Sequence, residues 1–268
     1  MKSFTKFVIC AAALTGISLG AAEVINIADS KFMRPALGKV VIANNQITHT
    51  GKAFIFGKTK FDIDPAKKYT FKYTIVNNSD KMVIVYGGIN AYDAAGKEYS
   101  SYSWQGNPKS MTEVVADAKK GDTKLTVKNG SAWVTNPSTS IVVNAKADFS
   151  DVPNKNAVAD RVIKREKTGD VWVLTLEKPL RADVKAGTVI RQHFHSGYFY
   201  LRGASPSRVA PKSSVTVNTT IQGNAAVLGR FNQKNWPVNA KKASFLLLSN
   251  YTNVKADVII KDATLTIE

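Results

Sequence analysis

Apolar and polar side chains alternate along most of the chain. In the segment Y-T-F-K-Y-T-I (69–75), aromatic and aliphatic residues take every second position, with threonine or lysine between them. This period of two places one face of a strand on a core and the other face in water. The same pattern predicts strands at 83–86, 124–128, 141–144, 171–176, 189–194, 213–222, 245–249, 256–261 and 264–267. Turn residues at 93–96, 129–130, 168–170 and 253–255 separate them, and such a series of short strands is typical of a β-sandwich or β-barrel.

The character of these strands changes twice along the chain. Residues 23–112 and 191–268 are rich in aromatic side chains, whereas residues 113–190 contain few. Insertions at loop tips are tolerated, because the two ends of an inserted unit lie close together. We therefore predict one β-sandwich, built from 23–112 and 191–268, that is interrupted by a small inserted β-barrel at 113–190.

The first 22 residues follow a different pattern. Lys2 and Lys6 precede a short apolar run at 7–19, and small residues follow at 20–22. This order is typical of a secretory signal peptide, and the run is too short to span a membrane. We expect cleavage near Ala22 and a secreted protein, periplasmic or extracellular, without a transmembrane segment. Cleavage would also remove Cys10, the only cysteine of the chain, so the mature protein would be held together by its core alone.

The formal charge is +17 for the whole sequence, and removal of the two leader lysines lowers it to +15. A charge of this size favours an anionic partner, such as an acidic glycan, another polyanion or an anionic membrane surface. The basic residues are spread along the chain and form no run of five, which argues against a nucleic-acid-binding arm. Solubility is the alternative explanation of the charge.

The two outer segments resemble a known family. F-D-I-D-P-A-K-K-Y-T-F-K-Y-T-I followed by V-Y-G-G-I-N-A-Y-D-A-A-G-K-E-Y is similar to the first half of the jelly-roll carbohydrate-binding modules that are attached to secreted polysaccharide-degrading enzymes. The C-terminal A-K-K-A-S-F-L-L-L-S-N-Y-T-N-V-K-A-D-V-I-I-K-D-A-T-L-T-I-E resembles their last two strands. This resemblance implies a jelly-roll sandwich and a carbohydrate ligand. The predicted fold class is thus all-β, a jelly-roll β-sandwich interrupted by an inserted small β-barrel.

The same resemblance raises the question of a structural calcium ion. Modules of this family often have two adjacent acids before the final strand, one of which supports the ion. Here the pair is Lys261-Asp262, so Asp262 is the one candidate ligand that carries over. We expect no other cofactor. The inserted segment resembles small β-barrel caps of viral and secreted proteins, through G-D-T-K-L-T-V and L-x-x-x-V-K-A-G-T-V.

Aromatic residues in polar loops are the candidate ligand-binding groups. A flat ring stacks on the apolar face of a sugar, while neighbouring amides and cations hydrogen-bond its hydroxyl groups. Two stretches combine these types, K-E-Y-S-S-Y-S-W-Q-G-N-P and F-N-Q-K-N-W-P-V, and core packing is the alternative role for each tryptophan. The residues predicted to bind a ligand are Tyr99, Tyr102, Trp104, Gln105, Arg191, Arg230, Lys234 and Trp236.

The segment R-Q-H-F-H-S-G-Y-F-Y-L-R-G (191–203) holds two of the three histidines, and three interpretations compete for it. The first is a metal site, in which His193 and His195 share a strand face and the third ligand is His49 or an unassigned acidic residue. The second is a polysaccharide lyase, because β-elimination needs a carboxylate neutraliser, a base and an acid. Its candidate residues are His193, His195, Tyr198, Tyr200 and Arg202. The third, which we favour, is a partly buried polar face where the insert ends and the sandwich resumes.

The function predicted from these observations is non-catalytic binding of a polysaccharide, and the charge favours an anionic one. The alternatives are a lyase acting on a uronic-acid glycan and a structural cell-surface protein. A glycoside hydrolase finds little support, since most acidic residues fall in turns or on predicted surfaces. The mature chain contains no G-x-S-x-G, Walker or dinucleotide-binding motif, and we expect no nucleic-acid partner.

Overall fold

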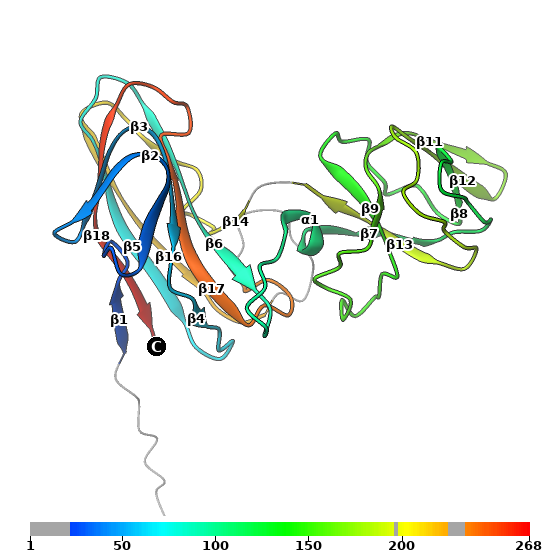
Figure 1. Cartoon of the computed structure of the whole chain (residues 1–268), viewed down its shortest axis with the longest axis horizontal. Helices are drawn as coiled ribbons and strands as arrows, with labels where there is room; N and C mark the ends of the chain where they lie inside the picture. Colours follow the sequence, from blue (N-terminus) through cyan, green and yellow to red (C-terminus); the bar gives the residue numbers. More distant parts are fainter. Residues whose placement is uncertain (1–21, 196–197, 225–233) are drawn as a thin grey trace, which may run out of the picture.

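The computed structural model describes residues 22–195, 198–224 and 234–268, so the predicted signal peptide lies almost entirely outside the described residues. Within them the protein is all-β with one short helix, which confirms the predicted class (Figure 1). The elements are β1 (Glu23–Asn26), β2 (Met33–Ala43), β3 (Gln46–Gly57), β4 (Phe61–Asp62), β5 (Tyr69–Asn77), β6 (Val83–Tyr92), α1 (Ser101–Trp104), β7 (Gly106–Glu113), β8 (Lys124–Val127), β9 (Thr139–Val143), β10 (Ala157–Ala159), β11 (Val162–Thr168), β12 (Val171–Leu176), β13 (Val189–Phe194), β14 (Phe199–Tyr200), β15 (Ser207–Val209), β16 (Ser213–Ile221), β17 (Lys242–Ser249) and β18 (Asp257–Ile267).

Strands from both outer segments form one large antiparallel sheet in the order β14-β6-β17-β3-β18-β5-β16. The sheet curls over at β3, because this strand changes partner halfway. Its first half pairs with β18, as Thr50 does with Asp257, and its second half pairs with β17, as Ala53 does with Ser249. Gly51 lies at this change with a φ of 72°, a left-handed conformation that favours glycine. The curl turns the sheet into two layers of a sandwich.

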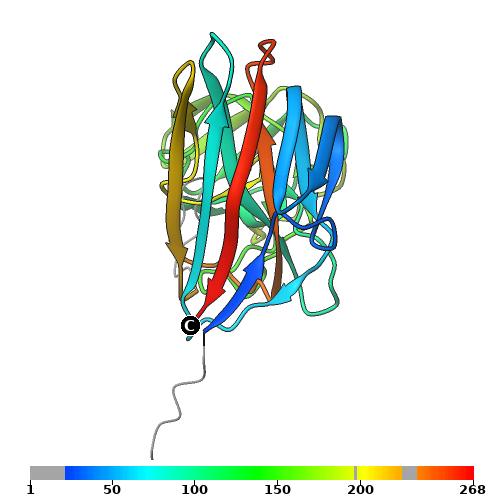
Figure 2. The same cartoon turned by 90° about the vertical axis from the view of Figure 1, so that its left-hand side faces the viewer.

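One layer of the sandwich faces the rest of the chain. In Figure 2 the layer of β16, β5 and β18 faces the viewer, and the green segment of residues 106–194 lies behind the sandwich. Figure 1 shows β6, β17 and β14 on the side of α1 and of that segment. The outer face of the β14-β6-β17-β3 layer is therefore the one next to the second part of the molecule.

The space between the layers is filled by the alternating apolar side chains. In β5 the predicted inward residues Tyr69, Phe71, Tyr73 and Ile75 are all buried, while Lys72 is exposed, so the predicted faces are confirmed. Phe71 stacks on Phe245 of the opposite layer, with ring centroids 5.4 Å apart. Each such side chain stabilises the fold by about 1.5–3 kcal/mol through burial, less the entropy of ordering it.

Residues 106–194 form two further antiparallel sheets, in the orders β10-β9-β13-β7 and β11-β12-β8. They enclose a second core, in which Trp133 and Leu125 are fully buried, and an isolated bridge from Val114 to Val127 joins the two sheets at one side. The first of these strands begins at Gly106 and the last ends at Phe194. The sheets thus extend beyond 113–190 at both ends. The segment that separates them from β6 is α1, which lies before the predicted boundary at 113.

The sequence pattern missed a long hairpin near the N-terminus. β2 and β3 pair along most of their length, and Asn44 and Asn45 connect them with φ angles of 51° and 57°. Two residues with positive φ are the signature of a tight type I′ hairpin turn, which asparagine tolerates. No helix among the described residues is long and apolar enough to cross a membrane.

Candidate binding face and pocket

Arg191 lies at the junction of the two parts and is completely buried. Its guanidinium binds the carboxylate of Asp151, with Nη2 2.7 Å from Oδ2, and also donates to the carbonyl of Lys146 at 3.2 Å. The loop that carries Asp151 packs on the sandwich, since Val152 is part of the sandwich core and its carbonyl accepts a hydrogen bond from Asn239 at 2.9 Å. The prediction of Arg191 as a ligand contact is therefore wrong, because its guanidinium is buried in the junction and paired with Asp151.

His193 belongs to the same network. Its Nε2 accepts a hydrogen bond from Nε of Arg191 at 3.0 Å, which requires the neutral ring to donate from Nδ1 to the carbonyl of Tyr102 in α1. Burial and the neighbouring Arg191 charge lower the pKa of His193 to about 4. Both ring nitrogens are occupied, so His193 joins α1 to the Arg191–Asp151 pair instead of acting as a metal ligand or a base.

The other residues of the metal hypothesis lie elsewhere. His49 is bonded within the sandwich, with Nδ1 2.9 Å from the carbonyl of Gly51 and Nε2 2.8 Å from the hydroxyl of Ser249. His195 is exposed and lies beside the ring of Tyr102, with centroids 5.5 Å apart. Asp262 is exposed at a bulge of β18. Within residues 22–195, 198–224 and 234–268, no three histidine, cysteine or acidic residues gather around one point.

The two tryptophans predicted as stacking platforms are buried. Trp236 is fully enclosed in the sandwich core and meets the ring of Tyr69 edge-on at 4.8 Å. Trp104 is 4% exposed and packs on Phe199 at 5.1 Å. Polar sequence neighbours misled the prediction, because both indoles turn inward and join the sandwich core. Gln105 is also buried, Lys234 is exposed, and Arg230 lies outside the described residues.

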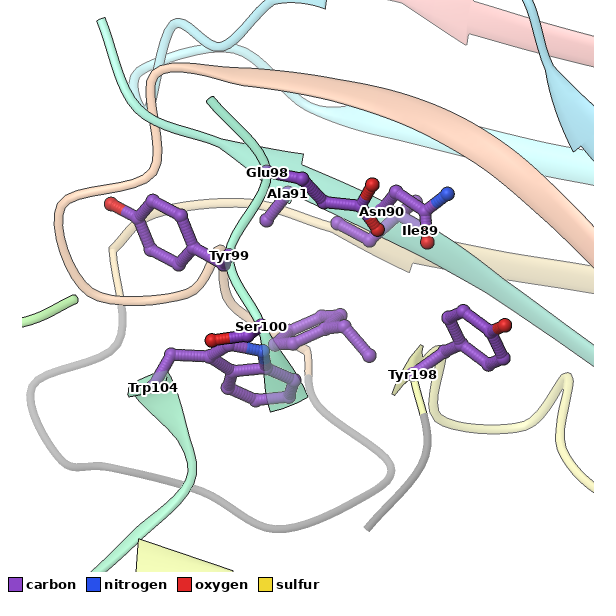
Figure 3. Close-up of a pocket in the computed structure, with 9 residues that line it drawn as sticks. Ile89, Asn90, Ala91, Glu98, Tyr99, Ser100, Trp104 and Tyr198 are labelled. Atoms are coloured by element: carbon purple, nitrogen blue, oxygen red, sulfur yellow. The ribbon is translucent and has the colours of Figure 1, made fainter. Parts of the chain in front are cut away.

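Trp104 nevertheless lines a pocket of about 300 Å³ at the end of β6 (Figure 3). It shares this pocket with Tyr99 and Ser100 from the segment before α1, and with Tyr198 next to β14. The structure thus brings together Tyr99 and Trp104 from the predicted binding set and Tyr198 from the lyase set. Asn90 and Glu98, which the sequence analysis did not single out, supply its amide and its carboxylate.

Several polar groups of this pocket are free to bind a ligand. The Asn90 side chain is 8% exposed, and neither its amide nor the Glu98 carboxylate has a hydrogen bond to any described residue. The Ser100 hydroxyl is buried without a described partner. Partial burial raises the pKa of Glu98, and the nearby Lys60 opposes this shift. Buried polar groups without partners are uncommon, so the pocket is suited to water molecules or to a ligand rich in hydroxyl groups.

A strip of aromatic rings continues from the pocket along the outer face of the sandwich. We call it the aromatic strip, and it consists of Phe54, Phe56, Tyr86, Tyr198, Tyr200 and Tyr251. Neighbouring rings lie close together: Tyr198 to Phe56 at 5.6 Å, Tyr198 to Tyr200 at 6.5 Å, Tyr200 to Tyr86 at 5.3 Å, Tyr86 to Tyr251 at 5.4 Å and Tyr251 to Phe54 at 6.3 Å. Tyr251 is 49% exposed and the others are half-buried, so the strip presents a connected surface.

The pairing of the strands explains how the strip forms. Leu246 of β17 lies opposite both Phe56 and Gly88, and Leu248 lies opposite both Phe54 and Tyr86. The two leucines are buried although neither belongs to a core cluster, which indicates that outer-face side chains cover them. Tyr200 pairs with Gly88, where the missing side chain lets the backbone of β14 approach closely. The strip therefore rests on an apolar floor.

Two cationic side chains flank the strip, Lys52 at the end away from the pocket and Arg34 nearer to it. The Lys52 ammonium lies 4.6 Å from the ring centroid of Tyr251 and 5.1 Å from that of Phe54. Arg34 is exposed on β2 and pairs with Phe56, so it emerges on the same face. The pocket end carries Glu98 instead. The cations thus lie along the strip outside the pocket, whereas the pocket itself carries a carboxylate.

The signal for this face is present in the sequence but has the form of a core pattern. K-A-F-I-F-G (52–57) and F-L-L-L-S (245–249) are apolar at consecutive positions, which is typical of strands covered on both faces. From alternation we predicted a strand at 245–249 and none at 52–57, so the second face of these runs was not considered. Phe54 and Phe56 were missed for this reason.

The lyase candidates do not form one site. His193 is enclosed at the junction, Tyr198 lines the pocket, Tyr200 lies on the strip and Arg202 is exposed beyond β14. Burial raises the pKa of Tyr200 to about 12 and also raises the pKa of Tyr198. A tyrosine base would need the opposite shift to be ionised near neutral pH.

No protein-family model and no curated protein matches the sequence. The chain is similar to a solved viral structure described as "Structure of infectious bursal disease virus Gx strain", at 10% sequence identity and a TM-score of 0.17. The similarity covers 92% of this chain, which spans 41% of the length of the viral chain. A likeness this low carries no argument about fold or function.

Proposed function

We propose that the protein binds a polysaccharide, without catalysis, on the outer face of the β14-β6-β17-β3 layer. The observation that carries this proposal is the aromatic strip, six neighbouring rings on one sheet face that lead into a pocket with unsatisfied polar groups. Rings in a row stack on successive sugar units, and the polar groups beside them select the hydroxyl pattern.

The charge supports an anionic chain as the ligand. Lys52 and Arg34 lie beside the strip, where they would meet sulfate or carboxylate groups of a glycan that is stacked on the rings. The formal charge of +15 expected for the secreted form would also attract a polyanion over longer distances. Secretion, predicted from the leader sequence, belongs to the same proposal.

Affinity electrophoresis tests the proposal. The native protein is run through gels that contain κ-carrageenan, in which sulfated and uncharged sugar units alternate, or alginate, in which every unit is a uronate. We expect retardation in at least one gel, and we expect Tyr200→Ala to weaken the affinity about tenfold through loss of one stacking partner. Tyr102→Ala is the control, because this ring contacts His195 and not the strip. Unaltered mobility of the folded protein in both gels would contradict the proposal.

A further inference from the structure

We infer that the pocket receives the terminal sugar unit of the polysaccharide, and that this unit is uncharged. The inference rests on the proposed function, since it places one end of a chain that lies on the aromatic strip. It adds that the protein binds at the ends of polysaccharide chains and does not bind at internal positions along the polymer.

The geometry of the pocket carries the first step. Tyr198 belongs both to the strip and to the pocket, so a chain stacked on the strip reaches the pocket past this ring. Figure 3 shows Trp104 across the pocket from Tyr198. Trp104 is 4% exposed and packs on Phe199, which makes this side a wall of the sandwich core and not an exit. A chain entering past Tyr198 therefore ends there.

The polar groups carry the second step. Figure 3 shows the Asn90 amide and the Glu98 carboxylate along the same side of the pocket. Neither has a hydrogen bond to a described residue, and the Ser100 hydroxyl is buried without one. The terminal unit of a glycan carries a hydroxyl group that an internal unit has lost to the glycosidic bond. A site with several unsatisfied groups gains most from that extra hydroxyl, because each unpaired buried group costs stability until it is satisfied.

The charges carry the third step. A uronate or sulfate in the pocket would lie next to the Glu98 carboxylate, and the two negative charges would repel each other. Lys52, which suits anionic groups, lies beside Phe54 and Tyr251 at the other end of the strip. Arg34 pairs with Phe56 and is not among the residues that line the pocket. Lys60 lies close enough to act on the Glu98 carboxylate, but its ammonium donates a hydrogen bond to the carbonyl of Gly96 at 2.8 Å and lies above the ring of Tyr92. The face therefore matches a chain with anionic internal units and a neutral end.

Calorimetric titration with κ-carrageenan fragments of graded length tests the inference. If the pocket reads the terminus, one protein binds per fragment at every length, and Asn90→Ala weakens the affinity about tenfold. Glu98→Gln serves as the second variant should Asn90→Ala fail to fold, and it is expected to weaken binding in the same direction. Asn218→Ala is the matched control, because Asn218 is exposed on β16 in the other layer.

The outcomes separate the inference from the proposed function. A number of bound proteins that rises in proportion to fragment length shows internal binding, which overturns the terminal site and leaves the proposed function standing. One protein per fragment with full affinity in both pocket variants overturns the role of Asn90 and Glu98. Absence of binding at all lengths, to alginate fragments as well, overturns the proposed function and the inference together.

Discussion

At the scale of single residues, burial and hydrogen bonding distinguish a functional site from a structural contact between the two parts of the molecule. Arg191, His193 and Asp151 are types found in active centres, yet each is bonded on every side. The Asp151 carboxylate accepts from Arg191, from the Asn154 side chain at 2.8 Å and from the Lys146 backbone at 3.1 Å. Buried charges are tolerated when they are paired and hydrogen-bonded in this way. The three residues connect the two parts of the molecule.

Removing one partner of the buried Arg191–Asp151 ion pair should therefore destabilise the folded protein. We expect Asp151→Ala to lower the free energy of unfolding by about 3–5 kcal/mol, since it leaves the Arg191 guanidinium buried without a counter-charge. Urea unfolding measures the change. Lys185→Ala is the control, because it breaks the solvent-exposed pair with Asp117 and should change stability little. Equal effects of the two variants would show that Arg191 does not depend on Asp151.

The same network predicts a pH dependence of stability. The pKa of His193 is about 4 in the folded protein and 6.5 in the unfolded chain, so the unfolded chain binds more protons between these values. His193 thus contributes stability that is fully present above pH 6.5, and on the order of 3 kcal/mol is lost as the pH falls to about 4. Urea unfolding at several pH values should show this slope in the native protein and a reduced slope in His193→Gln. His195→Gln, at an exposed ring, should retain it. An undiminished slope in His193→Gln would refute the assignment.

At the scale of elements, the sequence predicts the core-facing residues of strands that are buried on one face only. It does not separate the two faces of strands that are buried on both. The alternation in β5 fixed which residues point to the core, because its other face is threonine and lysine. β17 has no such contrast, since four consecutive apolar residues bury both faces. Periodicity cannot show that Phe245 and Leu247 belong to the core while Leu246 and Leu248 carry the aromatic strip. The site was missed where the pattern lost its alternation.

Gly88 is the position at which an element determines the site. A Cβ atom there would lie 2.6 Å from the backbone oxygen of Phe199, so any side chain must displace β14. We expect Gly88→Ala to lower the free energy of unfolding by about 1–3 kcal/mol, as other overpacking substitutions do. It should also weaken polysaccharide binding, because β14 positions Tyr198 and Tyr200.

Thermal unfolding and affinity electrophoresis measure the two effects. Gly51→Asn is the control, as a Cβ there meets nothing within 4 Å and asparagine tolerates the positive φ. Native binding by a stably folded Gly88→Ala variant would show that β14 does not set the strip.

At the scale of the whole molecule, the insert and the sandwich meet beside the layer that carries the strip. The loop around Asp151 fixes this junction, through Val152 in the sandwich core and through the hydrogen bond from Asn154 to the Ser103 carbonyl at 2.8 Å. The resemblance of the outer segments to carbohydrate-binding modules predicted a sandwich, and the class is confirmed. The pocket lies where the chain leaves β6 and passes through α1 into the insert.

The most direct test of the central claim is a calorimetric comparison of the native protein with the double variant Tyr86→Ala/Tyr251→Ala, titrated with the polysaccharide that retards the native protein. Both rings lie on the strip and outside the core clusters, so the fold should persist, as circular dichroism would verify. If the outer face of the β14-β6-β17-β3 layer is the binding surface, the variant binds at least about tenfold more weakly. An unchanged affinity in the folded double variant would contradict the account.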